Sequence, residues 1–376
     1  MTTPPAPAPT DGNAPVLVDH PRLRTALTEF FARHGLPSAR AELAADALCH
    51  GDLTGHASHG VFNLARLYLP LLESGRCDPG ATPRTLTDLG ACALVDAERA
   101  LGLWAAAEAM DDAVARARRH GVGLVSVRGA THFGCAGFHA ARAAEAGMIG
   151  VVMSNCGGQR IACPPGGTLP MLGTNPLSVA APALPGHPFL LDMATTTAPS
   201  GRVRLAAREG RPVPGGWLED AAGNPVTDPA AFDRGEAFLR WLGGTPDEGV
   251  HKGYGLGLAV ELLAAVASGA GRGPAPAALD GDGGPHGRDD DIGFLLLALA
   301  PDVLRPGADT PAEARSLFTA LTDCPPRPGR PPVRYPGWHE AERARLRRRD
   351  GIPLPGHVHE ELAALGLFAP ATGGAR

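Results

Sequence analysis

The sequence predicts an α/β fold. Helical and strand-like segments alternate between residues 101 and 154: a long alanine-rich helix at Leu101–His120, a strand at Gly121–Val127, a helix at Ala136–Ala146 and a strand at Ile149–Ser154. Such alternation is typical of helices layered on a sheet. Hydrophobic residues make up 44% of the 376 residues. This allows a sizeable core in about two or three domains.

The same periodicity places the elements on either side of this region. The elements expected before it are a Pro/Ala/Thr-rich disordered tail at 1–15, helices at Pro21–His34, Ser38–His50 and from near Ser58 to about Ser74, a turn-rich connection at Gly75–Pro83 and a strand at Ala91–Asp96. The elements expected after it are short strands at Leu177–Ala181 and Phe189–Asp192, a helix at Tyr254–Ser268, a mobile Gly/Pro/Asp loop at 269–291, a strand at Ile292–Leu299 and helices at Pro311–Leu321, His339–Arg349 and His357–Leu367. Glycine and proline recur through 155–216, which predicts a loop-rich, partly antiparallel region.

Composition excludes several classes of protein. A net charge of -5 and a pI near 6.3 give no electrostatic reason to expect a nucleic-acid partner. No apolar stretch reaches membrane-spanning length, and the N-terminus lacks a signal pattern. Seven cysteines without a CxxC pair favour reduced thiols in a cytoplasmic protein, and neither a zinc site nor an HExxH motif is expected. The arginine cluster at 343–349 is interpreted as a solvated helix face.

Lys252 is the only lysine among 34 lysines and arginines. It lies in His251-Lys252-Gly253-Tyr254-Gly255, a glycine-punctuated segment that leads into an apolar run. A lysine is a compact ammonium with three donors, whereas arginine is a wide planar fork. The segment therefore predicts an ammonium that points into a tight polar cleft; the alternative is a surface lysine retained by chance.

Two histidines and one carboxylate stand out as candidates for proton transfer. His59 lies in Ser58-His59-Gly60, at the expected start of a helix, and His132 follows a strand and opens another helix. Asp192 ends an apolar strand, where a buried carboxylate needs a partner. An Asp192–His59 pair would fix the imidazole tautomer and raise its pKa. The alternatives are a structural histidine and an aspartate that caps the segment at 195–197.

No standard phosphate-binding loop is present. Gly121-Val122-Gly123 precedes its strand, Gly253-Tyr254-Gly255 lacks a third glycine, and no Walker A sequence occurs. A dinucleotide would therefore need another scaffold. The turn Gly173-Thr174-Asn175-Pro176 would present backbone N–H groups and polar side chains to a ligand, unless it is an ordinary tight turn.

Seven segments taken together resemble a known family. They are Ser58-His59-Gly60, Thr131-His132-Phe133-Gly134-Cys135-Ala136-Gly137, Ser154-Asn155, Gly173-Thr174-Asn175-Pro176, Leu191-Asp192-Met193-Ala194-Thr195, Gly215-Gly216-Trp217 and His251-Lys252-Gly253-Tyr254-Gly255-Leu256. Their order resembles that of the type 2 malate/L-lactate dehydrogenases, which also include ureidoglycolate, sulfolactate and diketogulonate enzymes and reductases of cyclic imino acids. The resemblance covers roughly residues 23–367.

The resemblance implies a non-Rossmann fold with a largely antiparallel central sheet and a helical domain built from both chain ends. The helical domain is expected at 16–85 and 310–376, and the NAD(P)- and substrate-binding α/β domain at 86–309. It further implies a homodimer, NAD or NADP as cofactor, no metal, and a small carboxylate substrate. The implied reaction is hydride transfer between nicotinamide and the carbon of a C=O or C=N group beside that carboxylate.

The resemblance also carries over roles for individual residues. The catalytic set would be His59 as proton donor and acceptor, Asp192 as its partner and His132 on the substrate side. The substrate-binding set would be Ser58, Asn63, Arg66, Asn155, Cys156, Thr174 and Lys252. The cofactor-binding set would be His132, Asn155, Gly173, Thr174, Asn175, Leu190, Leu191, Asp192, Met193, Ala194, His251, Lys252, Gly337 and Trp338.

One position departs from the family pattern. The family usually has an arginine four residues after the first histidine, where it pairs with the substrate carboxylate, and this chain has Asn63. Arg66 lies near one turn further on and would substitute. Trp338 and His339 also follow Gly337 where members often carry Pro-Gly-Glu. These changes leave open a reductase of cyclic imino acids, or a relative that binds a ligand without catalysis.

Overall fold

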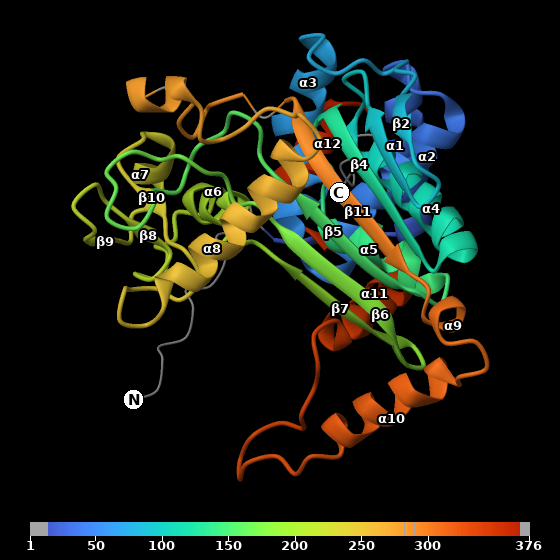
Figure 1. Cartoon of the computed structure of the whole chain (residues 1–376). Coiled ribbons are helices and arrows are strands. Elements are labelled where there is room, and N and C mark those ends of the chain that lie inside the picture. The colour runs from blue at the N-terminus through green and yellow to red at the C-terminus, as the bar shows by residue number, and fades with distance from the viewer. Residues whose placement is uncertain (1–13, 282, 289, 369–376) are drawn as a thin grey trace, which may run out of the picture.

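A seven-stranded sheet forms the centre of the fold (Figure 1). The computed structural model describes residues 14–368 except 282 and 289. Its strands are β2 (Arg84–Asp88), β3 (Cys92–Asp96), β4 (Val122–Ala130), β11 (Ile292–Leu299), β5 (Ile149–Ser154), β6 (Leu177–Leu184) and β7 (His187–Met193), in that spatial order. Only β3 and β4 pair in parallel, so the largely antiparallel sheet predicted from the resemblance is confirmed.

Helices cover this sheet and join its strands. The described α-helices are α1 (His20–Arg33), α2 (Ser38–Thr54), α3 (Leu69–Glu73), α4 (Gly102–His120), α5 (Ala136–Glu145), α6 (Ser200–Arg208), α7 (Ala230–Asp233), α8 (Val250–Val260), α9 (Pro301–Leu304), α10 (Thr310–Thr322), α11 (Trp338–Asp350) and α12 (Gly356–Ala364). Shorter 3₁₀ turns are η2 (Ala57–His59) and η5 (Pro276–Asp280), and π-helical turns are η3 (Leu64–Tyr68) and η4 (Glu261–Val266).

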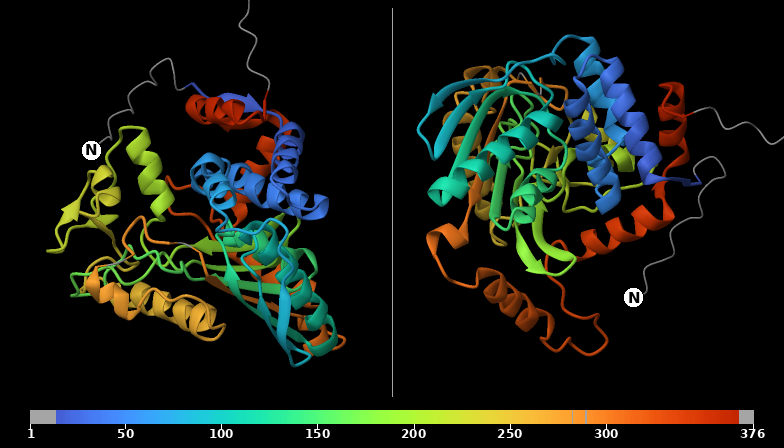
Figure 2. Two further views of the ribbon diagram at one scale, coloured as in Figure 1. Left: turned by 90° about the horizontal axis from the view of Figure 1, so that it is seen from above. Right: turned by 90° about the vertical axis from the view of Figure 1, so that its right-hand side faces the viewer.

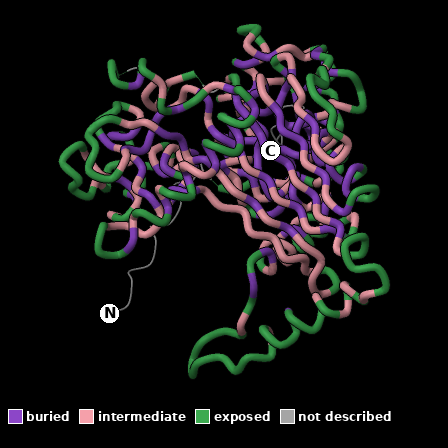
Figure 3. The backbone as a smooth tube through the Cα atoms, viewed as in Figure 1, coloured by how far each residue is buried: buried purple, intermediate pink, exposed green. Residues whose placement is uncertain are grey.

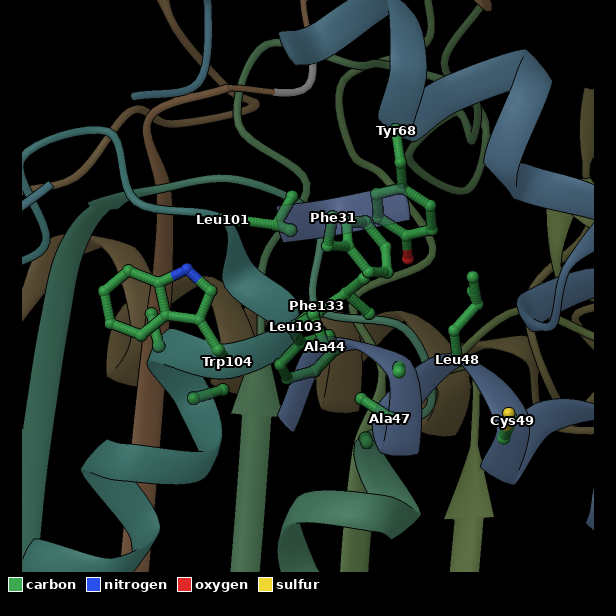
Figure 4. Close-up of a cluster of buried hydrophobic side chains, with 14 of the residues drawn as sticks. Phe31, Ala44, Ala47, Leu48, Cys49, Tyr68, Leu101, Leu103, Trp104 and Phe133 are labelled. Carbon is green, nitrogen blue, oxygen red and sulfur yellow. The ribbon is translucent and has the colours of Figure 1, made fainter. Parts of the chain in front are cut away.

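The main hydrophobic core lies between the sheet and its helices. α4 and α5 pack on the strands, and α2 packs in turn on α4. Buried residues are concentrated in these layers (Figure 3). Phe31, Leu48, Leu103 and Trp104 are fully buried where α1, α2 and α4 meet, and Phe133 joins the same cluster (Figure 4). Because Phe133 directly follows His132, this core supports one edge of the site described below.

Both ends of the chain contribute to one helical layer, seen from two further sides in Figure 2. β1 (Val16–Val18) pairs antiparallel with β12 (Ile352–Leu354), and α11 packs on α2. α10 lies elsewhere, because it packs against β6 and its Phe318 ring stacks on Phe189 at 5.7 Å between centroids. The exact domain limits remain a prediction.

A second, smaller core forms a subdomain around Trp241. It contains the three short strands β8 (Leu218–Glu219), β9 (Pro225–Val226) and β10 (Phe238–Leu239), together with α6 and α7. The indole N–H of Trp241 donates to the Cys163 carbonyl at 2.7 Å. α6 touches η2, since a Cβ on Gly201 would lie 2.9 Å from the Ser58 Cβ. The subdomain therefore faces the turn that carries His59.

Several predicted elements differ from the structure. The helix expected from Ser58 is interrupted, because η2 is a separate turn and the π-helical η3 precedes α3. The helix expected from Tyr254 begins at Val250, so His251 and Lys252 lie in its first turn. The prediction missed β1, β2, β12, α6, α7, α9 and the whole β8–β10 sheet, whose short strands give almost no periodic signal. Residues 1–13 of the expected tail lie outside the described residues, and the mobility expected at 269–291 stays a prediction.

Candidate active site

One cavity lies between the main sheet and the small subdomain. Its volume is about 870 Å³, which falls in the usual range for small-molecule and cofactor sites. The cavity is bordered by η2, by the segments that follow β4, β5 and β7, by α6 and residues 211–217, and by α11. Segments far apart in the sequence thus meet at one place.

The cavity brings together about half of the residues predicted from the sequence. Those that line it are Ser58, His59, Arg66, His132, Asn155, Cys156, Thr174, Asp192, Met193 and Ala194. Those that do not line it are Asn63, Gly173, Asn175, Leu190, Leu191, His251, Lys252, Gly337 and Trp338. The predicted roles remain proposals in both groups.

The two candidate histidines lie side by side. The ring centroids of His59 and His132 are 6.0 Å apart, and the ring planes are inclined by 23°. Tyr68 reaches out of the core, and its hydroxyl lies 2.9 Å from His132 Nδ1. The Gly134 N–H also donates to His132 Nδ1, at 3.2 Å. Because Nδ1 accepts, the neutral ring of His132 carries its proton on Nε2.

His59 is held by the turn in which it lies. Its Nδ1 is 3.1 Å from the Ser58 hydroxyl. Burial, and secondarily the proximity of His132, lowers the pKa of His59 to about 3. Burial likewise lowers the pKa of His132 to about 4. Both rings are therefore neutral at neutral pH in this structure, and the expected rise in the pKa of His59 is wrong.

Asp192 lies in the same cavity but does not hydrogen-bond His59. Its carboxylate accepts the Gly137 N–H at 2.7 Å, near the N-terminus of α5. A carboxylate at this end of a helix satisfies a free N–H and complements the helix dipole. Burial raises the pKa of Asp192, and the hydrogen bond from Gly137 opposes that rise. The predicted pairing is thus replaced by a contact with a helix start, and the helix is α5, not the segment at 195–197.

The turn that carries His59 packs on a buried aspartate, Asp52. Asp52 Oδ2 accepts the Val61 N–H at 2.8 Å, and a Cβ on Gly60 would collide with the same carboxyl group. A residue larger than glycine at position 60 would therefore push the turn off Asp52. Burial raises the pKa of Asp52 to about 7. The His59 turn thus depends on a carboxyl group that titrates near neutral pH.

Asn63 and Arg66 act as a pair. The Asn63 amide donates to the Ser58 carbonyl at 2.8 Å, so the side chain points into the turn and away from the cavity. Its Oδ1 accepts from Arg66 Nε at 3.2 Å and from Arg66 Nη2 at 2.8 Å. Asn63 therefore holds the Arg66 guanidinium at the cavity wall. Of the two side chains, only Arg66 lines the cavity.

Asn155 and Asn175 belong to a buried network around Glu261. Asn155 donates to the Gly271 carbonyl at 2.7 Å and accepts the Gly293 N–H at 2.9 Å. Asn175 donates to Glu261 at 2.8 Å and to the Gly257 carbonyl at 2.9 Å. Their amides fasten α8 and residues 271–273 to the sheet. These bonds occupy the amide N–H groups that the prediction had aimed at a ligand, whereas the Asn175 Oδ1 atom has no partner within the described residues.

Cys156 and Thr174 form the floor of the cavity. Their Sγ and Oγ1 atoms are 3.6 Å apart, and a Cβ on Gly173 would collide with the Cys156 side chain. Burial raises the pKa of the Cys156 thiol. The thiol is therefore protonated and acts as a wall, since a thiolate would be needed for nucleophilic chemistry.

Two predicted cofactor segments lie outside the cavity. Lys252 is exposed in the first turn of α8, behind the small core, so the sole lysine does not point into the cleft of its own chain. Gly337 packs on β7, where the Leu190 N–H donates to the Pro336 carbonyl at 3.0 Å. The Trp338 ring stacks on His187 with centroids 3.9 Å apart. These residues therefore pack along the edge of β7, outside the cavity.

Sequence reasoning missed several arginines of the cavity. Arg202, Arg204 and Arg211 enter it from α6 and the following loop, a region that carried no motif. Arg343 and Arg347 enter it from α11. The interpretation of that arginine cluster as wholly solvated is therefore wrong for these two. Their spacing of four residues was the available signal, because it puts both on one helix face.

The cavity fits a nicotinamide dinucleotide in size and in its donors. Arg343 and Arg347 form no ion pair with a carboxylate within the described residues, which leaves guanidinium N–H groups for phosphate oxygens. Among those residues no group of three or more histidine, cysteine or acidic side chains is arranged to hold a metal ion. Within the described part of the chain no helix is long and apolar enough to cross a membrane.

Comparisons with known proteins agree with the geometry. The sequence profile of the malate/L-lactate dehydrogenase family matches residues 18–363. A malate dehydrogenase of Pyrococcus horikoshii is 37% identical over 252 residues, which are 67% of this chain and 69% of the relative. A delta(1)-pyrroline-2-carboxylate reductase of Ancylobacter novellus is 30% identical over 335 residues, covering 88% of this chain and 92% of the relative. The crystal structure of malate dehydrogenase from Entamoeba histolytica matches with a TM-score of 0.86 at 26% identity, covering 95% of this chain and 99% of that one.

The fold and the histidine-lined cavity define an oxidoreductase whose sheet lacks the Rossmann arrangement. The chain belongs to the malate/L-lactate dehydrogenase family, so the resemblance predicted from its motifs is confirmed. Its relatives are dehydrogenases and reductases, and the family implies a nicotinamide cofactor.

Proposed function

We propose that the chain catalyses hydride transfer between NAD(P) and a 2-oxo acid/2-hydroxy acid pair. The observation that carries this proposal is the meeting of His59, His132 and Arg66 on one cavity. A reaction of this kind needs a proton donor or acceptor at the substrate oxygen and a cation at the carboxylate. Both requirements are met within one wall of the site.

His59 is the proposed general acid and base. In the oxidative direction its neutral imidazole accepts the hydroxyl proton, while the bound cofactor supplies the hydride acceptor. In the reductive direction the imidazolium returns that proton to the carbonyl oxygen. A carboxylate that enters beside the ring favours the charged form, which opposes the lowering of the pKa of His59 by burial.

The neighbouring groups orient this proton transfer. Ser58 holds His59 Nδ1, so Nε2 is the nitrogen left for the substrate. His132, with its proton on Nε2, would donate to the substrate oxygen from the other side. Asp192 would act on the site by holding the start of α5 and by its charge. Such fixed donors stabilise developing charge without reorganisation.

Arg66 is the proposed partner of the substrate carboxylate. It is held by Asn63, and its position in the cavity compensates for the arginine that family members carry at position 63. Thr174 and Cys156 would form the floor under the substrate. An arginine–carboxylate contact is roughly twice as strong as a neutral hydrogen bond, so Arg66 would contribute strongly to substrate affinity.

The second candidate substrate is a cyclic 2-imino acid. One observation favours it: both cavity histidines have lowered pKa values, of about 3 and about 4. An iminium ion carries its own proton on nitrogen, so its reduction to an amine requires hydride transfer but no proton from the enzyme in that step. A site with neutral imidazoles suits such a substrate.

The proposed site would take NADH or NADPH. Asp192, Met193 and Ala194 would border the nicotinamide half, and the edge of β7 toward Gly337 would take the adenosine half. Gly173, Asn175, Leu190 and Leu191 would support this wall from behind. Asn155 would stabilise it through the Glu261 network.

We also propose a cytoplasmic homodimer. α8 and η4 carry an exposed apolar face with Leu256 at 40%, Leu262 at 60%, Leu263 at 40% and Val266 at 51% exposure. Contiguous apolar surface of this kind marks an interaction site. His251 and Lys252 begin the same helix, so a second copy would be the route by which they reach a cofactor. All seven cysteines are free, as expected for a reducing compartment.

A substrate panel tests the proposed function. Pyruvate, a larger 2-oxo acid and a cyclic 2-imino acid are each offered with NADH and with NADPH, and the loss of nicotinamide absorbance is followed. Turnover of the oxo acids supports the first candidate, and turnover of the imino acid alone supports the second. Absence of turnover with every pair, by a protein that also binds neither cofactor, would remove the proposal. Sedimentation of the wild type and of Leu262→Glu tests the dimer separately.

A further inference from the structure

Two arginines of α11 face the cavity as a pair. Arg343 and Arg347 are four residues apart, so they lie on one helix face, and both line the cavity beside Gly55 and His56. The other face of α11 carries Arg345, which is exposed and pairs with Glu342 at 2.9 Å. The helix therefore separates two kinds of arginine: one turned to solvent and one turned to the cavity.

Each inward arginine is fixed to the C-terminus of α2. Arg343 Nη1 donates to the Thr54 carbonyl at 2.7 Å, and Arg347 Nη1 donates to the Asp52 carbonyl. The last carbonyls of a helix are its negative end, which favours nearby cations. Gly55 ends α2 with φ 92°, and a Cβ there would lie 2.6 Å from Arg343. Glycine at position 55 thus leaves the space that the guanidinium occupies.

The pair has a surplus of positive charge. Neither side chain forms an ion pair with a carboxylate in the described ranges, and each uses one of its five N–H donors on α2. Burial, and then the neighbouring Arg343, lowers the pKa of Arg347, while Asp52 raises it. Two guanidiniums held close together without a counter-ion form a site that favours an anion.

The remaining arginines of the cavity are committed differently. Arg204 pairs with Asp233 at 2.9 Å, Arg211 pairs with Glu209, Arg202 lies over the Trp217 ring at 4.9 Å, and Arg66 is held by Asn63 beside the histidines. The α11 pair is the set bound only to backbone carbonyls. A dinucleotide carries phosphates at its centre, and the sequence offers no glycine-rich loop to hold them. Other donors must therefore bind those phosphates.

We infer that Arg343 and Arg347 form the binding site for the phosphate groups of the nicotinamide cofactor. This inference rests on the proposed function. The fixed guanidiniums replace the backbone N–H groups and helix N-terminus that bind phosphate in Rossmann proteins. The nicotinamide end then extends from α11 past Asp192 toward His59, along the cavity wall.

Direct binding of cofactor tests the inference. The dissociation constants of NADH and NADPH are measured by calorimetry, without substrate, for the wild type, Arg343→Ala, Arg347→Ala and the control Arg345→Ala. Loss of a charge-assisted hydrogen bond is expected to raise the dissociation constant about tenfold or more for the first two variants. The control, which removes an arginine from the outer face of the same helix, is expected to bind like the wild type.

A comparison of NADH with NADPH identifies which phosphate group the two arginines bind. Equal weakening for NADH and NADPH assigns the pair to the bridging phosphates, and weakening for NADPH alone assigns it to the 2′-phosphate; both outcomes support the site. Where an alanine variant fails to melt cooperatively, the lysine variant takes its place. Lysine keeps the positive charge but lacks the planar guanidinium with its paired N–H donors, so the lysine variant is expected to bind the cofactors more weakly than the wild type.

Unchanged affinity of both inward variants for both cofactors overturns the inference. That result would leave the proposed function intact, because the wild type would still bind a nicotinamide cofactor elsewhere in the cavity. A wild type that binds neither NADH nor NADPH would instead remove the proposed function itself. The two failures are therefore distinguishable in one experiment.

Discussion

The two walls of the cavity differ in how firmly their side chains are held. On the wall of the main domain, Ser58 and Asn63 are buried and hydrogen-bonded into the turn that presents His59. On the wall of the small subdomain, Arg204 is held by Asp233, but Arg202 is exposed and lies over the Trp217 ring at 4.9 Å, and Arg211 is exposed. This difference agrees with the proposed function, in which the first wall would carry the chemistry and the second would distinguish substrates.

Physical reasons support this division. Proton transfer needs groups held near their productive geometry, which a packed wall provides. Substrate choice needs only a difference in affinity, which exposed side chains can supply. Substitutions of the proton-transfer groups on the main wall should therefore change the rate constant of the reaction, substitution of Arg66 on the same wall should weaken the binding of every carboxylate substrate, and substitutions on the small wall should change only the affinity for particular substrates.

The largest effect is expected for His59→Asn on the main wall. Removal of the proton-transfer group should lower kcat by about 10²–10⁴-fold with an oxo acid, while the dissociation constant for NADH or NADPH changes little. Steady-state kinetics and calorimetry measure the two quantities. His120→Asn, at the exposed end of α4, is the control. Wild-type kcat in the His59 variant would place the proton transfer elsewhere.

Arg66→Met should produce the next largest effect, on KM. Loss of the cation at the substrate carboxylate should raise KM roughly 10–100-fold, with a smaller change in kcat. Asn63→Ala should raise KM in the same direction but less, since it releases the guanidinium without removing it, and it should also lower kcat somewhat, since it removes the bond to the Ser58 carbonyl in the His59 turn. The double variant should cost less than the sum of the two. Additive effects would show that Asn63 does not act through Arg66.

A pH-dependent effect is expected for Asp52→Asn. Burial raises the folded-state pKa of Asp52 from 3.8 to about 7, so the protonated carboxyl is favoured by folding. The resulting stability is full below pH 3.8 and is lost as the pH rises through about 7. The asparagine variant avoids this loss, so its stability relative to the wild type should increase over that range, by on the order of 2–4 kcal/mol. Urea unfolding at pH 4, 6 and 8 measures it, and a difference independent of pH would contradict it.

The smallest effect is expected for Arg202→Ala on the small wall. The side chain is exposed, so its removal should change KM for pyruvate by less than about threefold. A substrate with a second negative group should lose more affinity, because a second anion would face this wall. Kinetics with a mono- and a dicarboxylic oxo acid make the comparison. A large fall in kcat with both would remove the distinction between the walls.

The fold and the site were predictable to different extents. The helix–strand alternation at 101–154 has strong periodicity, and the structure has β4, α5 and β5 there. The small subdomain was missed because β8, β9 and β10 have two residues each, too few for a pattern. The motif residues His59, His132 and Asp192 reach one cavity as predicted.

The partners of those residues were less predictable. Asp192 binds a helix start, and Asn175 binds Glu261, because long-range packing decides which polar groups meet. Lys252 was singled out because it is the only lysine, but that fact does not show where its side chain points. In the structure the side chain is exposed in the first turn of α8. The sequence does show that Arg343 and Arg347 are four residues apart and share a helix face. It does not show which face of the helix is turned inward, because that depends on the packing of α11 on α2.

The most direct test of the central claim is the structure of a ternary complex with NAD(P)H and an unreactive substrate analogue. The account predicts the nicotinamide ring in the cavity between the two walls, with His59 within hydrogen-bond reach of the analogue's oxygen or nitrogen and the reacting carbons about 3–3.5 Å apart. A cofactor bound outside this cavity, or an analogue that contacts neither His59 nor Arg66, would contradict it.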